Sequence, residues 1–356
     1  PLLVFFLVVS SLCNAGKSHG GVIKTVIILY MFSTVLAAVI AVFASMAFPV
    51  KMTLANAATD TSAPQGIVEV LNNLLLNVVA NPVSSLVNAN YVGILMWAVL
   101  LGLAFRVADK MTKKVLADVA DGISMVVTWI INLAPFGIFG LVFNTVSTNG
   151  LDIFTTYGKL LLLLVGCMLF IYFVTNPLLV YWCIRQNPYP LIFHCLKRSA
   201  LTAFFTRSSA ANIPVNMKVC EEMGLDRDTY SVTIPLGATI NMDGAAITIT
   251  VMTMATAFTL GIHVDIPTAI ILSLLAALSA CGASGVAGGS LLLIPMACSL
   301  FGISDDISMQ VVAVGFIIGV VQDSVETALN SSSDLLLSAS AEFRQWRLEG
   351  KEIKFK

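Results

Sequence analysis

The sequence predicts an all-α protein that crosses a membrane several times. Of its 356 residues, 58% are hydrophobic and only 11% are charged, whereas soluble domains carry about 25% charged residues. The apolar runs are long and continuous rather than alternating, which indicates spanning helices and not the strands of a barrel. Two of the runs are interrupted by polar or glycine-rich stretches, a pattern typical of helical hairpins that return to the side they entered.

Composition also narrows the classes of function. The formal net charge of −1 argues against a nucleic-acid partner. The seven cysteines include no Cys-x-x-Cys pair, and most of them lie in apolar context, which indicates buried free thiols. The three histidines have no paired ligand spacing, so a transition-metal site is not indicated.

The chain begins at Pro1 within an apolar run, so we expect a transmembrane helix that is cut, with a first helix missing upstream. The apolar runs and the loops between them then divide the sequence into segments. The expected segments are the end of a truncated transmembrane helix (1–13), a transmembrane helix (22–48), a long broken transmembrane segment (66–107), two transmembrane helices (115–148 and 155–184), a first re-entrant hairpin (191–224), a helix broken at Asn-Met-Asp-Gly (229–260), a second re-entrant hairpin (266–304), a helix with substrate and sodium residues (306–341) and a cytoplasmic tail (342–356).

The two expected hairpins fit no simple span. Segment 191–224 has moderately hydrophobic arms around a polar centre at 206–212, and segment 266–304 has no charged residue over 39 positions. The second segment is too long for one crossing, and its arms on either side of Gly282–Ser290 are each too short to span comfortably. The alternative for this segment is two ordinary spans joined by a glycine-rich turn.

The distribution of Lys and Arg supports this topology. With two re-entrant hairpins, 16 cations fall on one face and 2, Lys51 and Lys159, on the other, while Arg207 lies within the membrane. The positive-inside rule then puts the C-terminus in the cytoplasm. The 16 cations are Lys17, Lys24, Arg106, Lys110, Lys113, Lys114, Arg185, Lys197, Arg198, Lys218, Arg227, Arg344, Arg347, Lys351, Lys354 and Lys356.

A polar stripe in the last apolar run is the strongest functional signal. Its five residues fall at i, i+3, i+4, i+7 and i+11, within a helical sector roughly 100° wide. Ionisable groups at membrane depth are costly, so they usually face a bundle interior and mark a pathway. The alternative, an amphipathic helix on the membrane surface, conflicts with the apolar flanks. The stripe is Asp323, Glu326, Thr327, Asn330 and Asp334.

A second intramembrane carboxylate, Asp243, lies in Asn-Met-Asp-Gly, where Gly237 and Gly244 suggest local unwinding. Carboxylate, amide, hydroxyl and freed carbonyl oxygens suit hard cations, and Na⁺ is the obvious one in a membrane carrier. A carboxylate also binds an ammonium group, and N–H groups at a hairpin tip bind a carboxylate. The combination fits an amino acid zwitterion. Arg207 needs a partner, which Asp323 or Glu326 can supply.

An intramembrane enzyme and a channel are the alternatives to a carrier. Gly282-Ala-Ser-Gly285 matches the Gly-x-Ser-Gly of rhomboid-type proteases, but no histidine follows residue 263 to act as base. A paired-aspartate intramembrane protease lacks its usual Gly-Asp motif here. A channel is harder to exclude from sequence and stays as a less favoured reading.

At these motifs the chain resembles the sodium:dicarboxylate symporter family of glutamate transporters and their bacterial homologues. The match runs from Pro1 to about Ala341. The motifs that carry it are Thr-Arg-Ser-Ser (206–209), Pro-Leu-Gly-Ala-Thr-Ile-Asn-Met-Asp-Gly (235–244) and the acidic stripe. The amino-acid sequence of residues 203–216 is most similar to that of the family's bacterial sodium/serine–threonine symporters. The resemblance implies a homotrimer in which each protomer has a scaffold and a mobile transport domain of two hairpins and two helices, working as an elevator.

The resemblance also implies residue roles. Asp323 takes the substrate amine, while Ser209 and Asn330 take its carboxylate. The implied substrate residues are Arg207, Ser208, Ser209, Val286, Ala287, Gly288, Asp323, Glu326, Thr327 and Asn330. The implied Na⁺ residues are Gly237, Asn241, Asn330 and Asp334 in one site, Thr239 with carbonyls near 280–283 in a second, and Asp243, Asn241, Tyr30, Ser33 and Thr34 in a third.

The chain departs from the family pattern in three places. Ala245 stands where Thr is usual, and Ala287 replaces the usual Pro of the glycine-rich tip. Glu326 stands where members with acidic substrates carry the Arg that pairs with the substrate side chain. A Glu there repels aspartate or glutamate, so we expect Na⁺-coupled symport of serine or threonine across the cell (inner) membrane. The alternative is an Na⁺- or H⁺-coupled symporter of acidic amino acids or dicarboxylates.

Overall fold

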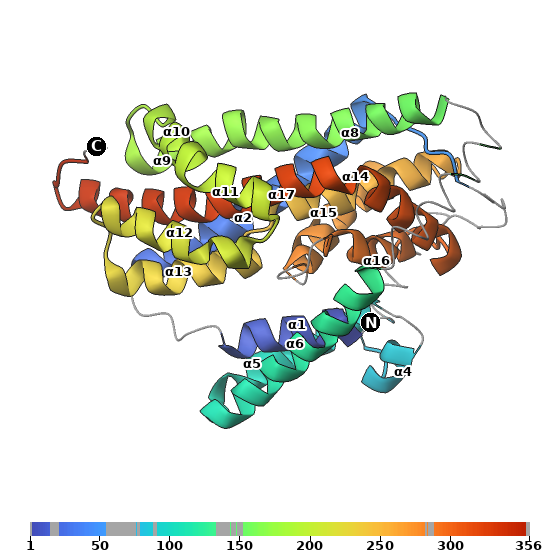
Figure 1. Ribbon diagram of the computed structural model, residues 1–356, viewed down its shortest axis with the longest axis horizontal. Helices are drawn as coiled ribbons and strands as arrows, with labels where there is room; N and C mark the ends of the chain where they lie inside the picture. Colours follow the sequence, from blue (N-terminus) through green and yellow to red (C-terminus); the bar gives the residue numbers. More distant parts are fainter. Residues whose placement is uncertain are drawn as a thin grey trace.

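The computed structural model describes residues 2–14, 21–54, 76, 79–87, 91–132, 143, 147, 152–281, 283 and 288–353. All regular secondary structure among these residues is helical (Figure 1). The helices are α1 Leu2–Asn14, α2 Gly21–Ala47, α4 Pro82–Val87, α5 Tyr91–Ala104, η1 Phe105–Val107, α6 Lys110–Asn132, α8 Asp152–Phe170, η2 Ile171–Thr175, α9 Asn176–Ile184, α10 Tyr189–Cys195, η3 Leu196–Ala200, α11 Leu201–Thr206, α12 Ser209–Glu222, α13 Arg227–Ile240, α14 Asp243–Thr259, α15 Ile266–Ala280, η4 Leu291–Leu293, α16 Ile294–Ser299 and α17 Asp305–Leu348.

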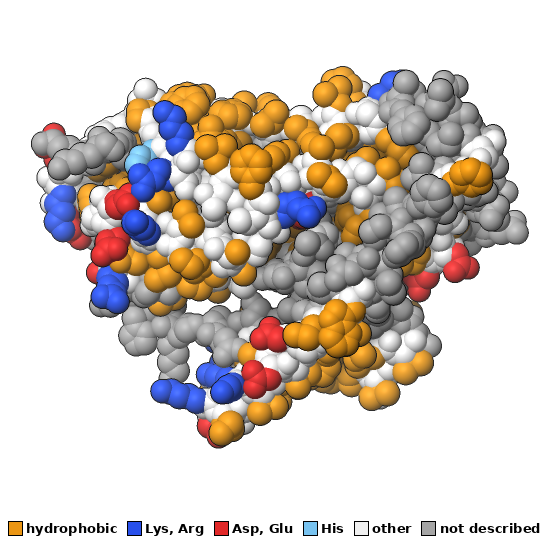
Figure 2. Space-filling model, in the orientation of Figure 1, with side chains coloured by type: hydrophobic (Ala, Val, Ile, Leu, Met, Phe, Trp, Pro, Cys, Tyr) orange, Lys and Arg blue, Asp and Glu red, His pale blue; other side chains and the backbone are white. Residues whose placement is uncertain are grey.

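Four helical runs in the described part of the chain are long and apolar enough to cross a membrane. They are Gly21–Ala47, Tyr157–Ile184, Val232–Thr259 and Asp305–Leu348. Figure 2 shows hydrophobic side chains over the middle of the larger body, while charged side chains gather at the end where the C-terminus lies. An apolar outer belt with charged residues at the end suits a protein surrounded by lipid. The protein is therefore an all-helical, multi-pass membrane protein.

The described helices form two groups. Helix α1 packs against α5 and α6, and this group lies below the larger body in Figure 1. In the larger body α17 is the central element, because α2, α9, α11, α12, α13, α14 and α16 all contact it. At a rise of about 1.5 Å per residue, its 44 residues extend about 66 Å, roughly twice the hydrocarbon thickness of a bilayer.

Two interruptions in the helices expose backbone groups next to α17. Between α13 and α14, Asn241 and Met242 leave helical geometry, with φ/ψ of −96°/80° and −118°/51°. Between α11 and α12, Arg207 adopts left-handed geometry at φ 49°, which is uncommon for a residue with a side chain. Ser208 then caps α12 by accepting a hydrogen bond from Ala211 N at 3.2 Å. Both interruptions leave polar groups facing the middle of α17.

The segment expected to form the second hairpin is described in part. Asp265 caps α15 through Thr268 N at 3.1 Å. After a stretch that includes Gly282 and 284–287, which lie outside the described residues, the chain resumes at Gly288 with a positive φ of 70°. The chain then continues through η4 and α16 to α17.

Helix α14 approaches α17 closely at Gly244. A Cβ atom on this residue would lie 2.9 Å from Glu326 Cγ and 3.0 Å from its Cα and carbonyl oxygen. Two of these three atoms belong to the backbone, which cannot turn aside as a side chain can. The absence of a side chain at residue 244 therefore sets the spacing of the two helices.

Gly244→Ala should lower the apparent melting temperature of the purified protein, because overpacking a tight helix contact costs about 1–3 kcal/mol. Gly158→Ala is the matched control, since this α8 glycine has no atom within 4 Å of its added Cβ. That variant should be neutral or slightly stabilising, because Ala is favoured over Gly in helices. Equal melting temperatures for the two variants would contradict the packing argument.

Candidate functional site

The middle of α17 carries a row of buried acidic side chains. Asp323, Glu326 and Asp334 are 6%, 5% and 1% exposed, and Asp243 at the start of α14 is fully buried beside them. Burying an ionised carboxylate costs several kcal/mol unless hydrogen bonds or opposite charges compensate. The partners of these four groups therefore define the site.

A small cavity lies between the α11–α12 turn, the α13–α14 break and α17. Its volume is about 30 Å³. The lining consists of polar and charged side chains with three small or apolar ones. The lining residues are Arg207, Ser208, Ser209, Met242, Ala283, Gly289, Asp323, Glu326, Thr327 and Asn330.

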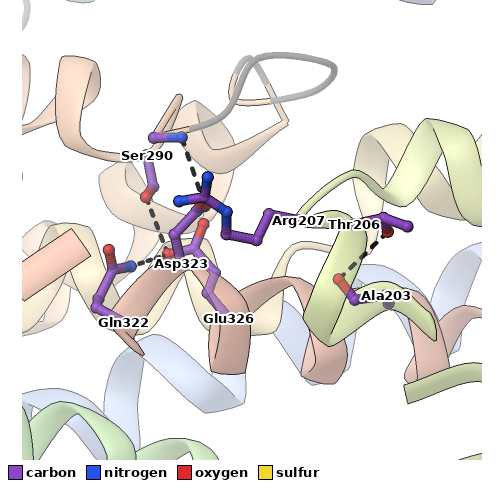
Figure 3. Close-up of polar contacts among 8 residues, drawn as sticks. Ala203, Thr206, Arg207, Ser290, Gln322, Asp323 and Glu326 are labelled. Atoms are coloured by element: carbon purple, nitrogen blue, oxygen red, sulfur yellow. Dashed lines mark hydrogen bonds and ion pairs between the residues drawn. The ribbon is translucent and has the colours of Figure 1, made fainter. Parts of the chain in front are cut away.

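Asp323 is held from two sides of this cavity. Arg207 extends from the α11–α12 turn toward it, with the guanidinium Nη1 3.9 Å from Asp323 Oδ2 (Figure 3). The backbone N–H of Gly288 donates to Asp323 Oδ1 at 3.4 Å. Both contacts are long, so each is weak and can be exchanged for a better partner. Asp323 thus connects the two interrupted segments without being saturated by either.

Glu326 has a different environment. Its Oε2 accepts hydrogen bonds from Thr248 Oγ1 at 2.7 Å, from Ser290 Oγ at 2.9 Å and from Gln322 Nε2. These donors come from α14, from the turn after Gly288 and from α17 itself, as Figure 3 shows for the last two. None of the described residues donates to Oε1. One oxygen of Glu326 therefore joins three elements, while the residue also lines the cavity.

A second polar cluster surrounds Asp243. Ser33 and Thr34 of α2 donate to its two oxygens, at 2.7 Å to Oδ2 and 3.1 Å to Oδ1. Thr34 Oγ1 also accepts from Met242 N at 3.2 Å. The carboxylate of Asp243 is thus held by hydroxyl groups, without a cation among the described residues.

Asp334 lies on the other side of the α13–α14 break. Its Oδ1 accepts from Asn241 Nδ2 at 2.9 Å, and its carbonyl oxygen accepts from Tyr30 OH at 2.8 Å. A Cβ on Gly237 would lie 2.8 Å from Asp334 Oδ1, so glycine is needed for this approach. Asn241 Oδ1 is buried and accepts no hydrogen bond from the described residues. An orphaned amide oxygen beside a carboxylate is a donor set suited to a hard cation.

The structure brings most of the predicted site residues together. Arg207, Ser208, Ser209, Asp323, Glu326, Thr327 and Asn330 line the cavity, and Gly288 contacts Asp323. Tyr30, Ser33, Thr34, Gly237, Asn241, Asp243 and Asp334 form the second cluster. Asn330 lines the cavity, and its Oδ1 also accepts a hydrogen bond at 2.7 Å from the backbone N–H of Gly244, the residue after Asp243. Asn330 therefore connects the cavity to the second cluster.

Three predicted residues do not join these clusters in the described part of the chain. Thr239 Oγ1 donates to Leu236 O of its own helix at 2.7 Å and is half-buried. Val286 and Ala287 lie outside the described residues.

Sequence reasoning missed the donors around Glu326 and one neighbour of Ser33. Gln322 was detectable, because it precedes Glu326 by four positions and so shares its helix face. Thr248 and Ser290 come from other elements, and no local spacing reveals them. Asn176, whose Oδ1 lies 3.5 Å from Ser33 Oγ, was visible only as an Asn-Pro pair in an apolar run.

The chain is similar in sequence to known membrane transporters. The family model for the sodium:dicarboxylate symporter family matches residues 1–342. The chain is also 59% identical over 354 residues to the serine/threonine transporter SstT of Bifidobacterium adolescentis, an alignment that covers 99% of this chain and 82% of that protein. The chain therefore belongs to the sodium:dicarboxylate symporter family.

Proposed function

We propose that this protein is a secondary active transporter that couples Na⁺ entry to the uptake of serine and threonine. One observation carries the proposal: four carboxylates are buried at the cavity and the second cluster, and of these four only Asp323 has a cationic side chain near it among the described residues. Such an excess of negative charge favours bound cations. The ammonium group of an amino acid and Na⁺ are the cations that a symporter of this family is suited to carry.

The substrate amine would bind Asp323. It must compete with Arg207 and Gly288, whose contacts at 3.9 and 3.4 Å are long enough to be replaced. The substrate carboxylate would face the start of α12 at Ser209, where free N–H groups and the helix dipole favour an anion. Arg207, once released from Asp323, is also available to this carboxylate. The tip of the second interrupted segment, including Val286 and Ala287, would close over the bound molecule.

Glu326 would determine which side chain is accepted. It adds a second carboxylate to a cavity that already contains Asp323, and like charges disfavour an acidic substrate. Its Oε2 is occupied by three donors, whereas Oε1 is available to accept the hydroxyl group of serine or threonine. This supports a neutral hydroxy amino acid over the alternative of a dicarboxylate.

Na⁺ would bind at the second cluster. Asp334, Asn241, Asn330 and the backbone near Gly237 would build one site, and Asp243 with Ser33, Thr34 and Tyr30 another. Carboxylate, hydroxyl and amide oxygens are the ligands that hard cations prefer. Thr239 would contribute to a further site only if its hydroxyl group left Leu236.

The larger arrangement follows the family resemblance. We propose a homotrimer in the cell (inner) membrane, with the C-terminus in the cytoplasm, in which segments 191–224 and 266–304 are re-entrant hairpins. The body around α17 would move as an elevator. The distribution of Lys and Arg supports this orientation.

Uptake of radiolabelled serine into proteoliposomes tests the function directly. We expect uptake only with an inward Na⁺ gradient, no inhibition by excess aspartate, and no uptake by Asp323→Ala because the amine loses its counter-charge. Uptake without Na⁺ would point to a facilitator or channel. Strong inhibition by aspartate would contradict the proposed specificity.

Glu326→Gln should reduce the preference for serine over alanine by about tenfold or more, since a hydrogen bond to a charged group is worth about 1.5–3 kcal/mol. Competition against labelled serine measures the preference. Glu326→Arg, with Arg207→Ser if needed, should admit aspartate as a competitor. Glu342→Gln is the matched control, because this buried α17 carboxylate accepts from Asp226 N at 2.7 Å, away from the cavity. An unchanged serine/alanine ratio in Glu326→Gln would exclude the hydroxyl contact.

Ser290→Ala should loosen the tip of the second interrupted segment, because the turn after Gly288 loses its bond to Glu326. Hydrogen–deuterium exchange over 288–293 should become about tenfold faster, as expected for one lost hydrogen bond to a charged acceptor. Ser279→Ala is the control, since that hydroxyl group bonds only to Ala276 O of its own helix. Exchange at wild-type rates in Ser290→Ala would show that Glu326 does not hold this turn.

A further inference from the structure

The junction of α8 and α9 is irregular in the middle of a predicted span. Residues Ile171–Thr175 form a π-helical turn, a form that is rare and often found at functional sites. Pro177 follows and has no N–H for the carbonyl four residues earlier, so Phe173 O accepts from Tyr189 OH at 3.3 Å instead. Between the turn and the proline lies Asn176, which is fully buried.

Asn176 faces the cluster around Asp243. Its Oδ1 lies 3.5 Å from Ser33 Oγ, which in turn lies 2.7 Å from Asp243 Oδ2. Its Nδ2 has no hydrogen-bond partner among the described residues. A buried amide with an unpaired donor and one long contact is costly, so the placement calls for a reason beyond packing.

The reason lies in the single hydroxyl hydrogen of Ser33. A serine hydroxyl group has one hydrogen to donate, and the short contact shows that Ser33 gives it to Asp243. If a cation binds between them, the oxygens of both residues must face it, and the hydroxyl hydrogen needs another acceptor. Thr34 has one in Tyr30 O, at 3.0 Å. For Ser33, the structure places Asn176 Oδ1 within reach as an acceptor, at 3.5 Å.

We propose that Asn176 is a positioning residue for the Na⁺ site at Asp243, acting by accepting the hydrogen of Ser33 when the ion binds. The inference rests on the proposed function, because it requires Na⁺ at this cluster. Outer partners of this kind orient the groups that contact a metal, and their loss typically weakens binding by about 10–100-fold. Asn176 would not contact the ion itself.

The test is a Na⁺ titration of thermal stability in the absence of amino acid, with K⁺ replacing Na⁺ at constant ionic strength. Asn176→Leu keeps the number and branching of the side-chain heavy atoms but removes the acceptor, so the Na⁺ midpoint should rise about tenfold or more. Asn176→Asp keeps the acceptor, and its midpoint should stay at or below the wild-type value. Thr175→Val, a change at the preceding buried residue, should leave the midpoint unchanged.

A double-mutant cycle separates this role from a structural one. In a Ser33→Ala background the hydroxyl hydrogen is gone, so Asn176→Leu should cause no further rise in the midpoint. An additive effect would overturn the proposal, as would a wild-type midpoint in Asn176→Leu. If Asn176→Leu does not fold, Asn176→Ala gives the same readout without adding a methyl group near Ser33. A wild-type protein that shows no Na⁺ response at all would instead refute the proposed Na⁺ coupling.

Discussion

The constraint on which the site depends is the cost of burying negative charge at membrane depth. Asp243, Asp323, Glu326 and Asp334 are almost inaccessible, yet a single guanidinium approaches one of them in the described structure. Hydroxyl and amide groups compensate the other three, and they come from α2, the end of α13, α14, the turn after Gly288 and α17 itself. At the break after Asn241, the N–H groups of Met242 and Gly244 donate outside their helix, to Thr34 and Asn330.

Close packing makes this compensation possible. Gly237 and Gly244 let α13 and α14 approach the acidic face of α17 so closely that a methyl group would touch Asp334 or Glu326. At these separations Gly244 N reaches Asn330 Oδ1, and Asn241 Nδ2 reaches Asp334 Oδ1. Glycine here serves the polar site rather than a turn, since both residues lie within helices.

The sequence predicted those parts of the fold and site that depend on local pattern. The all-helical membrane class followed from composition, and the stripe from Asp323 to Asp334 followed from helical spacing. Partners that meet only in three dimensions were not accessible in this way: Thr248 and Ser290 reach Glu326 from 78 and 36 residues away. Thr239 illustrates the opposite error. It lies in the same sequence motif as Asn241, but its hydroxyl group donates to Leu236 O of its own helix and not to the polar cluster. Pattern identifies a polar residue, but rotamer and packing decide which cluster it joins.

The geometry also gives a physical reason why the binding of an ion and the binding of an amino acid would depend on each other. Met242 donates its N–H to Thr34, accepts from Asn330 Nδ2 at 3.5 Å through its sulfur, and lines the cavity beside Asp323. Thr34 holds Asp243, and Asn330 lines the same cavity. An ion that fixed Thr34 would therefore fix Met242 and one wall of the cavity beside Asp323. Because linkage is reciprocal, an amino acid that orders this wall must raise the affinity for the ion by the same factor.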